Sequence, residues 1–423
     1  MERVEIPKVS FSRHRLENGL EVLLAPDREV PLVHVSLHYR VGSSCEPQGL
    51  SGFAHLFEHM MFQGSENVPK NEHGRHVDRA GGRWNASTNK DRTNYFETLP
   101  SHFLDLGLWL EADRMRALQV TEEAFRNQRD TVIEEKKQSY DNRPYGSSHL
   151  RFDELAYRNW AYAHPIIGSE DDLRAAGIED AQAFHRRWYG PGNAVLVLAG
   201  DIREKQALES VRRNFADIED FTDPQPPDLS EPPQDEEKME AMTDALAPLP
   251  AISLGYHSDP LGSPDYYALG LLSLILTDGH SSRLYRRLVH LRNRVTTVYV
   301  GSNQHKGPQL LRIWCQVQDG QDLDTVLAEL EEELTRLVEE GVSKSEIEKA
   351  RRKLAARFVS RLETRTRVGE LLAFYAVYYD DPGMIHRELE HFLRVDRNQL
   401  QETAARILRK KNRTLLIVQP RKS

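Results

Sequence analysis

A proline-rich acidic segment divides this 423-residue chain into two parts of similar length, and this division most constrains its fold. The prolines between residues 219 and 237 are Pro224, Pro226, Pro227, Pro232 and Pro233. Few apolar side chains accompany them, which is typical of a linker rather than of a packed element. We therefore expect an N-terminal domain at 1–218, a linker at 219–237 and a C-terminal domain at 238–423.

The two parts resemble each other. Four positions of one strand-like segment recur at a constant offset of 217, without a gap. The pairs are Val35 with Ile252, Ser36 with Ser253, Leu37 with Leu254 and Tyr39 with Tyr256. Each part also closes with an apolar strand-like segment that follows an asparagine, Asn193 or Asn412. Self-similarity of this kind predicts two homologous halves.

Local patterns predict a mixture of strands and helices. Asn18-Gly19 between apolar residues predicts a hairpin over 16–24, and strand-like segments follow at 32–41 and 84–99. Helical patterns cover 50–62, 103–118, 121–140 and 178–188. This order predicts an α+β fold, in which each half is a largely antiparallel sheet with helices packed on one face.

Composition and charge exclude several classes of protein. A net charge of −9 argues against a general affinity for nucleic acid. The most apolar stretch, 268–276, is much shorter than the roughly twenty residues of a membrane span, so we expect no membrane insertion. The first residues lack the pattern of a secretory signal, and Cys45 and Cys315 are the only cysteines. We therefore expect a cytoplasmic protein.

One apolar segment carries the motif His-x-x-Glu-His at His55, Glu58 and His59. On a helix the two histidines lie about 40° apart, and Glu58 is on the same side. Two imidazoles at this spacing can share one Zn²⁺, while the carboxylate takes a proton from the attacking water. The alternative is a buried helix whose histidines form hydrogen bonds within the core.

A catalytic zinc usually has three protein ligands and one open position. The helix expected at 121–140 offers Glu134 and Glu135. Glu135 is in phase with Gln128 and Val132 on the inward side, whereas Glu134 points about 100° away. We therefore expect Glu135 to be the third ligand. The alternative is an exposed glutamate paired with a nearby lysine.

With these residues in view, the whole chain resembles the inverzincin peptidases of the pitrilysin and insulinase type, family M16. The family includes mitochondrial processing peptidase, and this chain resembles its short, bacterial-type members. Glu135 lies 76 positions beyond His59, as the family motif requires. Further matches are Leu16-Glu17-Asn18-Gly19-Leu20, Gly81-Gly82, Asn85-Ala86-Ser87-Thr88, Asp91, Thr93, Tyr95 and Asn142-Arg143-Pro144-Tyr145-Gly146.

The resemblance implies that zinc is bound by His55, His59 and Glu135, and that Glu58 activates the water. It also implies that Asn85, Ala86 and Ser87 form an edge strand to which a substrate peptide adds as another strand. An edge strand suits this role because its unpaired backbone groups can hold an extended peptide whatever its side chains. A surface hairpin is the alternative from the residues alone.

The family also uses an arginine and a tyrosine seven residues apart in the second half. Here Arg292 and Tyr299 have that spacing, and Arg294 is a competing candidate. Such donors would stabilise the developing oxyanion of the substrate. By spacing alone, a solvated arginine and a core tyrosine are the favoured interpretation. The preceding Gly-His-Ser-Ser-Arg-Leu-Tyr at 279–285 adds to the resemblance.

The internal repeat predicts one metal site per chain. At the offset of 217, the positions of the zinc motif are occupied by Leu272, Ile275 and Leu276. Short members of the family work as dimers, and this chain carries both the zinc motif and the Arg and Tyr pair. We therefore expect a homodimer in which Arg292 and Tyr299 of one protomer reach the zinc of the other. A heterodimer with a second M16-like subunit is the alternative.

The sequence thus predicts a zinc-dependent metalloendopeptidase that hydrolyses short or unfolded peptides inside a dimer cavity. One alternative is a non-catalytic scaffold, like the core subunits of the respiratory bc1 complex, which resemble the family but have damaged metal motifs. The complete set of His55, Glu58, His59 and Glu135 argues against it. Another alternative is a specialised maturation protease acting with a partner chain, which would share the same chemistry.

Overall fold

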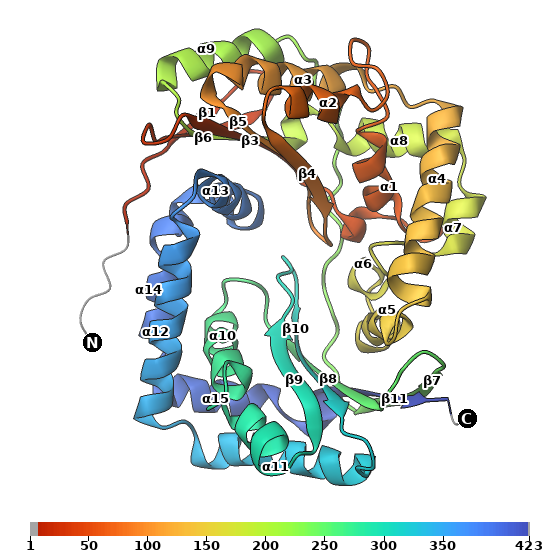
Figure 1. The fold of residues 1–423 in the computed structure, drawn as a ribbon, viewed down its shortest axis with the longest axis vertical. Coiled ribbons are helices and arrows are strands. Elements are labelled where there is room, and N and C mark those ends of the chain that lie inside the picture. Colours follow the sequence, from red (N-terminus) through yellow and green to blue (C-terminus); the bar gives the residue numbers. More distant parts are fainter. Residues whose placement is uncertain (1–6, 422–423) are drawn as a thin grey trace. The chain divides into compact units, whose positions relative to one another are not determined.

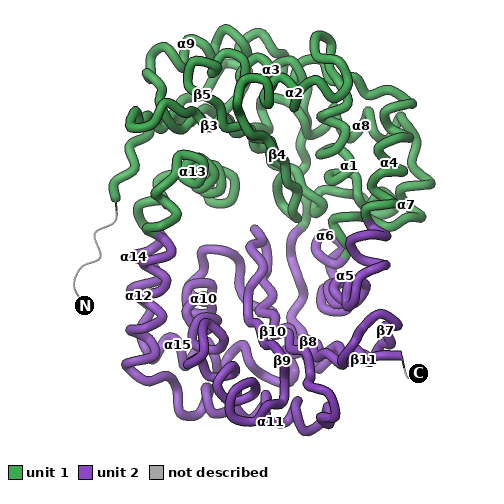
Figure 2. The backbone as a smooth tube through the Cα atoms, in the orientation of Figure 1, with its two compact units in different colours: residues 1–135, 164–228, 359–387 green, residues 136–163, 229–358, 388–423 purple. Residues whose placement is uncertain are grey.

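The computed structural model of the chain describes residues 7–421, which form two compact units (Figures 1 and 2). Unit 1 contains 7–135, 164–228 and 359–387, and unit 2 contains 136–163, 229–358 and 388–421. Residues 219–237 form neither helix nor strand, as expected of a linker. However, each unit includes a segment from the other half. The boundaries expected at 218 and 238 therefore do not separate the compact units.

Unit 1 is built on a six-stranded sheet with the order β1-β2-β6-β3-β5-β4. Its strands are β1 (Ser12–Arg15), β2 (Glu21–Pro26), β3 (Leu32–Tyr39), β4 (Arg83–Thr88), β5 (Thr93–Pro100) and β6 (Ala194–Gly200). Only β2 and β6 pair in parallel, so the sheet is largely antiparallel as predicted. The hairpin expected at 16–24 turns at Gly19, whose φ of 89° suits a glycine.

The helices of unit 1 are α1 (Phe53–Met60), α2 (Glu72–Arg79), α3 (Leu104–Ala117), α4 (Glu122–Lys136), α7 (Glu170–Ala175), α8 (Ile178–Trp188), α9 (Glu204–Phe215) and α13 (Arg365–Tyr379). Four of them, α1, α3, α4 and α8, lie within the predicted segments 50–62, 103–118, 121–140 and 178–188, and the other four were not predicted. The last residue of α4 belongs to unit 2, where a π-helical turn continues over Lys137–Asp141.

Helix α13 comes from the second half of the sequence and covers one face of the unit 1 sheet. Figure 1 shows α13 on the face opposite to α2, α3 and α9. Leu371, Leu372 and Ala376 of α13 pack against alternate residues of β6, among them Val195 and Val197. Strand β6 is buried along its whole length because helices cover both of its faces. The expectation of helices on one face missed this helix.

Unit 2 repeats the arrangement with five strands in the order β7-β11-β8-β10-β9. They are β7 (Lys238–Asp244), β8 (Ala251–Ser258), β9 (Val295–Ser302), β10 (Gln309–Val317) and β11 (Arg413–Pro420). The helices are α5 (Gly146–Ala156), α6 (Trp160–Ala163), α10 (Pro264–Thr277), α11 (Leu323–Glu340), α14 (Glu388–Arg394) and α15 (Arg397–Ile407). Helix α12 (Lys344–Arg361) begins in unit 2 and ends in unit 1.

Helix α5, which comes from the first half, packs on the unit 2 sheet. Phe152 and Ala156 of α5 contact a cluster that includes Leu310, Leu416 and Val418 of the strands. The other face of the same sheet packs against α10, α11 and α15. The two halves of the sequence therefore exchange helices, α13 for α5.

The internal duplication is visible in the pairing of the strands. Without β1, both sheets have the same order, and one parallel pair occupies the same place in each. Asn193 and Asn412 also make matching hydrogen bonds. Asn193 Nδ2 donates to Trp188 O at 2.9 Å and Asn412 Nδ2 to Ile407 O at 2.9 Å, each five positions earlier in the chain. The predicted α+β fold with two related halves is confirmed.

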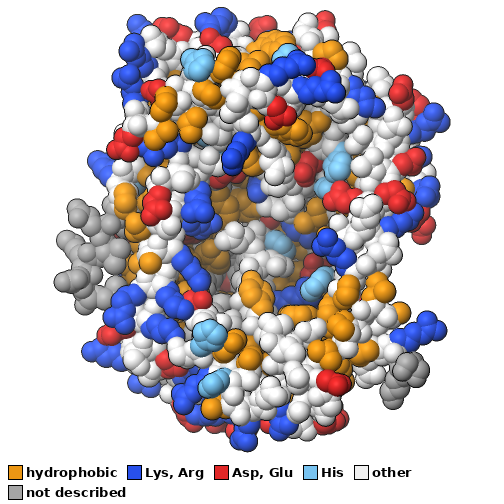
Figure 3. All heavy atoms as spheres, viewed as in Figure 1, with side chains coloured by type: hydrophobic (Ala, Val, Ile, Leu, Met, Phe, Trp, Pro, Cys, Tyr) orange, Lys and Arg blue, Asp and Glu red, His pale blue; other side chains and the backbone are white. Residues whose placement is uncertain are grey.

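Charged side chains of both signs are interspersed over the face of the molecule shown in Figure 3. Within residues 7–421, no helix combines the length and the apolar character that crossing a bilayer requires.

Candidate metal centre

Helix α1 carries the His-x-x-Glu-His motif and is anchored in the core of unit 1. It begins after Gly52, whose φ of 92° and close approach to Ile167 O exclude a larger residue, since an added Cβ would lie 2.9 Å from that oxygen. Phe57 is fully buried and stacks on Phe184 and Tyr189. This packing fixes the buried side of α1 and directs the motif to the opposite side.

Helix α4 supplies the third polar group. Its first turn carries Glu122 and Glu123, which suit the positive end of a helix. Val132 and Ile133 are buried and hold α4 against the rest of unit 1. Glu135 lies one turn beyond Val132, and its carboxylate reaches the two histidines, as the helical phase predicted.

The structure brings three donor groups together. His59 Nε2 lies 3.3 Å and His55 Nε2 lies 3.7 Å from Glu135 Oε2. The two imidazole rings have centroids 4.8 Å apart at an angle of 72°. All three side chains are partly buried, with the Glu135 carboxylate the most exposed. The cluster therefore keeps one open side.

The three groups shift one another's pKa values because they lie so close together. Burial and the neighbouring His59 lower the pKa of His55 to about 4, so its ring is neutral at pH 7. The hydrogen bond with His59 lowers the pKa of Glu135, which is therefore ionised. Burial would lower the pKa of His59, but Glu135 and Glu58 outweigh that effect and raise it. Two imidazoles and one carboxylate are thus gathered around one point.

The separations fit a tetrahedral zinc ion. With bonds of about 2.0–2.1 Å, tetrahedral ligand atoms lie about 3.3–3.4 Å apart. The observed 3.3 Å and 3.7 Å require only small movements of the side chains. Two nitrogen donors and one oxygen donor also form a ligand set that zinc commonly accepts. The residues present therefore fit the metal that the sequence predicted.

Glu58 lies beside the three donors without being one of them. Burial raises the pKa of its carboxyl group, while a hydrogen bond with Thr88, the last residue of β4, opposes that shift. A carboxylate with a raised pKa accepts a proton more readily than an exposed one, which suits a general base. Thr88 was not predicted to contact Glu58.

The predicted substrate strand lies at an edge of the unit 1 sheet. Asn85, Ala86 and Ser87 belong to β4, which pairs only with β5 among the described strands. Ser87 Oγ donates to Asn94 Oδ1 at 2.7 Å, which ties the strand to β5. The other edge of β4 pairs with no strand among residues 7–421.

Arg292 and Tyr299 belong to unit 2, whereas His55, His59 and Glu135 belong to unit 1. Tyr299 is 61% exposed on β9, which is one of the two edge strands of the described sheet. Arg294 Nε donates to Glu329 Oε1 at 2.9 Å, so this side chain already serves an internal ion pair. Of the two candidate arginines, Arg292 is the more available to a ligand.

The corresponding helix of unit 2 offers no metal donors at the equivalent positions. Leu272, Ile275 and Leu276 lie in α10 and are buried in the hydrophobic core of unit 2.

A second group of potential ligands occurs inside unit 1 but has a different character. Donor atoms of His73, Glu97 and Glu111 lie within 4.8 Å of one another, and all three side chains are buried. Arg114 Nε donates to Glu111 Oε2 at 2.9 Å. The fixed positive charge of Arg114 makes this cluster a poor place for a second cation.

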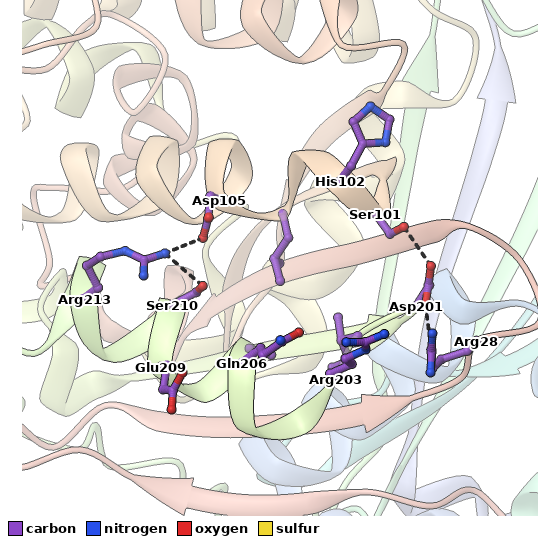
Figure 4. A pocket seen from close by; sticks show the side chains of 13 residues that line it. Arg28, Ser101, His102, Asp105, Asp201, Arg203, Gln206, Glu209, Ser210 and Arg213 are labelled. Carbon is purple, nitrogen blue, oxygen red and sulfur yellow. Dashed lines mark hydrogen bonds and ion pairs between the residues drawn. The ribbon is translucent and has the colours of Figure 1, made fainter.

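A polar hollow of about 520 Å³ lies elsewhere in unit 1, between α9 and the start of α3 (Figure 4). Arg213 is paired with Asp105 at 2.9 Å, and Arg28 with Asp201 at 3.2 Å. Since these charges neutralise one another within the wall, the hollow does not compete with the metal centre as a candidate site.

Sequence reasoning missed one further neighbour of the metal centre. A hydrogen bond with the Gln128 side chain contributes to the raised pKa of His59. In the sequence, Gln128 indicated only which side of α4 faces inward. Because Gln128 and Glu135 lie on the same side of that helix, Gln128 also faces α1.

The chain is similar to known proteins over most of its length. Residues 21–170 match the family described as Insulinase (Peptidase family M16), and residues 176–354 match Peptidase M16 inactive domain. The zinc protease PqqE of Helicobacter pylori is 30% identical over 372 residues, which cover 87% of this chain and 84% of that protein.

Two further proteins similar to this chain are also described as proteases. The uncharacterized zinc protease YmxG of Bacillus subtilis is 24% identical over 354 residues, 84% of this chain and 85% of that protein. The crystal structure of a protease from Helicobacter pylori superposes with a TM-score of 0.93 and 28% identity, covering 98% of this chain and all of that one. The chain belongs to peptidase family M16.

Proposed function

We propose that this chain is a zinc-dependent metallopeptidase that hydrolyses short or unfolded peptides. The observation that carries the proposal is the meeting of His55, His59 and Glu135 at separations that fit one zinc ion. Relatives named zinc proteases support the same metal. Zn²⁺ held by these donors would polarise the scissile carbonyl and make a water molecule more acidic.

The protein's own groups account for the proton transfers. Glu58 would accept the proton of the attacking water and later deliver it to the amine that leaves. The raised pKa of Glu58 favours both steps, because the carboxyl group must hold the proton between them. The hydrogen bond with Thr88 would keep the carboxylate oriented while its protonation changes.

We further propose that the substrate binds as an added strand on β4. Backbone pairing beside Asn85, Ala86 and Ser87 would hold an extended peptide with little dependence on its side chains. Thr88 closes this strand and contacts Glu58, so a peptide on the free edge would pass close to the catalytic carboxylate. A folded substrate lacks a free extended segment, which is why we expect short or unfolded peptides.

We also propose that Arg292 and Tyr299 donate hydrogen bonds to the substrate carbonyl. We propose a homodimer in which these side chains of one protomer serve the metal centre of its partner. A mixture of Glu58→Gln and Arg292→Ala proteins tests this arrangement. Recovery of activity after subunit exchange would support it, whereas two folded, exchanging variants that stay inactive would refute donation between protomers.

The test of the chemistry separates metal binding from hydrolysis. Glu58→Gln should retain bound zinc, since Glu58 is not among the three donors, but should lose cleavage of a peptide mixture. Glu134→Gln, an exposed change on α4 beside Glu135, is the matched control and should keep both. Full activity of Glu58→Gln would refute the mechanism. A wild-type chain without zinc and without chelator-sensitive cleavage would favour the scaffold alternative.

A further inference from the structure

The start of helix α1 is held by a carboxylate outside the His-x-x-Glu-His motif. Glu46 Oε2 accepts a hydrogen bond from the Gly52 N–H at 2.8 Å, and Glu46 Oε1 accepts one from the Ala54 N–H at 2.7 Å. Gly52, the N-cap residue, has no side chain that could cap the helix. Glu46 therefore takes the place of the cap, and its negative charge suits the positive end of the helix dipole.

Glu46 also binds a buried histidine. His164 Nε2 lies 3.0 Å from Glu46 Oε2, and both residues are almost fully buried. The backbone carbonyl of His164 in turn accepts a hydrogen bond from Lys90 Nζ. Lys90 lies in the turn that joins β4 to β5. A continuous polar link thus runs from the first turn of α1 to the end of the edge strand.

The backbone just before Glu46 is fastened to the same turn. The Ser43 N–H donates to Asn89 O at 3.1 Å, and the Ser44 N–H donates to Lys90 O at 2.8 Å. The segment that carries Glu46 is therefore attached to the β4–β5 turn both by these backbone hydrogen bonds and by the contacts of Glu46 through His164 to Lys90. A shift of Glu46 relative to β4 would break several hydrogen bonds at once.

Helix α1 and strand β4 pack against each other, and the link from Glu46 through His164 to Lys90 joins the start of the helix to the end of the strand. His55 directly follows Ala54, so a displaced first turn would move the first imidazole. The distance between the histidines and a peptide on β4 therefore depends on Glu46.

We propose that Glu46 is a positioning residue, which through His164 and Lys90 holds the motif-bearing helix in register with the edge strand. The inference rests on the proposed function, because it concerns the same site. It predicts that loss of the Glu46 carboxylate affects metal affinity and the rate of turnover more than it affects the binding of the peptide.

The test substitutes Glu46→Gln, which preserves size but turns one acceptor oxygen into a donor. We expect about a tenfold weaker zinc affinity, by analogy with residues that support metal ligands from outside the coordination shell. We expect kcat to fall by a similar, roughly tenfold factor while KM stays within about twofold. Competition with a chelator gives the affinity, and steady-state cleavage of a quenched fluorescent peptide gives the rates.

A matched control is available at the same end of α1. Asp172 binds the Ser51 N–H at 3.1 Å, but no hydrogen bond described above joins it to the β4–β5 turn. Asp172→Asn should lower thermal stability while leaving zinc affinity and kcat close to wild type. Equal losses in Asp172→Asn and Glu46→Gln would overturn the proposal, because any loosened helix start would then have the same effect.

A second variant covers the case in which Glu46→Gln does not fold. Lys90→Met removes the side-chain link from the turn to His164 but leaves both hydrogen bonds from Glu46 to the start of α1. It should lower kcat and spare zinc affinity, and an unchanged kcat would overturn the inference. A wild-type chain that binds no zinc would refute the proposed function itself. If the wild-type chain binds zinc and cleaves peptide, and Glu46→Gln matches it, only the positioning role fails.

Discussion

The exchanged helix α13 carries a partly buried carboxylate, that of Glu370, whose removal should destabilise unit 1. Glu370 accepts hydrogen bonds from His34 Nε2 at 3.1 Å, Ser36 Oγ at 2.6 Å and Asn94 Nδ2 at 2.9 Å. Burial alone would raise the pKa of Glu370, but His38 and His34 lower it well below the ordinary value. The carboxylate therefore fastens α13 to strands β3 and β5.

The cost of Glu370→Gln follows from these contacts. One carboxylate oxygen becomes an amide NH₂ group, which then faces a donor of the sheet. Asn94 cannot turn to compensate, because its Oδ1 already accepts from Ser87 Oγ at 2.7 Å and from Arg92 Nη1. Hydrogen bonds to charged groups contribute about 1.5–3 kcal/mol each, and a buried unpaired donor costs about 1–3 kcal/mol. We expect a loss of about 3 kcal/mol in the free energy of unfolding.

Urea unfolding at pH 7 measures this loss, and hydrogen exchange of the α13 amides localises it. Glu363→Gln, an exposed change just before α13, is the control and should be neutral. Because the folded-state pKa of Glu370 is lowered, its contribution is present above the ordinary glutamate pKa of about 4.3 and is lost as pH falls below it. The difference between wild type and variant should therefore shrink in acid. A loss under about 1 kcal/mol at pH 7 would refute the reasoning.

Two further predictions concern other parts of unit 1. Neither Glu97 oxygen meets an N–H or O–H donor among residues 7–421, and burial together with Glu111 raises the pKa of Glu97 well above its ordinary value. The free energy of unfolding should therefore fall as pH rises above about 4.3, by up to about 1.4 kcal/mol per pH unit. The Glu97→Gln variant should lack this pH dependence. Equal pH dependence in the wild type and the variant from pH 5 to 9 would contradict the prediction. Zinc at a hundredfold excess over its dissociation constant should raise the free energy of unfolding of the wild type, measured by calorimetry, by about 2.7 kcal/mol. The same zinc concentration should leave the stability of His59→Gln unchanged. An equal gain in both proteins would mean that the metal binds elsewhere.

The sequence predicted those features that depend on a local pattern. The helix expected at 178–188 is found at Ile178–Trp188, because Ala181, Phe184 and Trp188 repeat along one buried side. Glu135 was correctly preferred over Glu134 as the group that meets the histidines, since helical phase alone decides which side faces inward. The duplication could be predicted from the sequence because the related strands of the two halves are separated by a constant offset of 217 residues.

The remaining features depend on contacts that no spacing encodes. Leu372 and Ala376 show that one side of α13 is buried, but not that it packs on a sheet from the first half. Glu46 and Thr88 contact helix α1 from other elements, so no periodicity connects them with the motif. The helical segment expected at 121–140 continues to Asp141, but its last turn is π-helical rather than α-helical, a difference that the sequence pattern did not indicate.

The exchange of α5 and α13 gives the linker an unusual property. A proteolytic nick within 219–237 would not release two independent proteins, because each fragment would still supply one cover helix to the other's sheet. Expressed without its counterpart, the N-terminal fragment would leave Leu23, Val195 and Val197 exposed to water. A folded protein should then be recovered from a divided gene by fragment complementation, in which the two pieces assemble with each other.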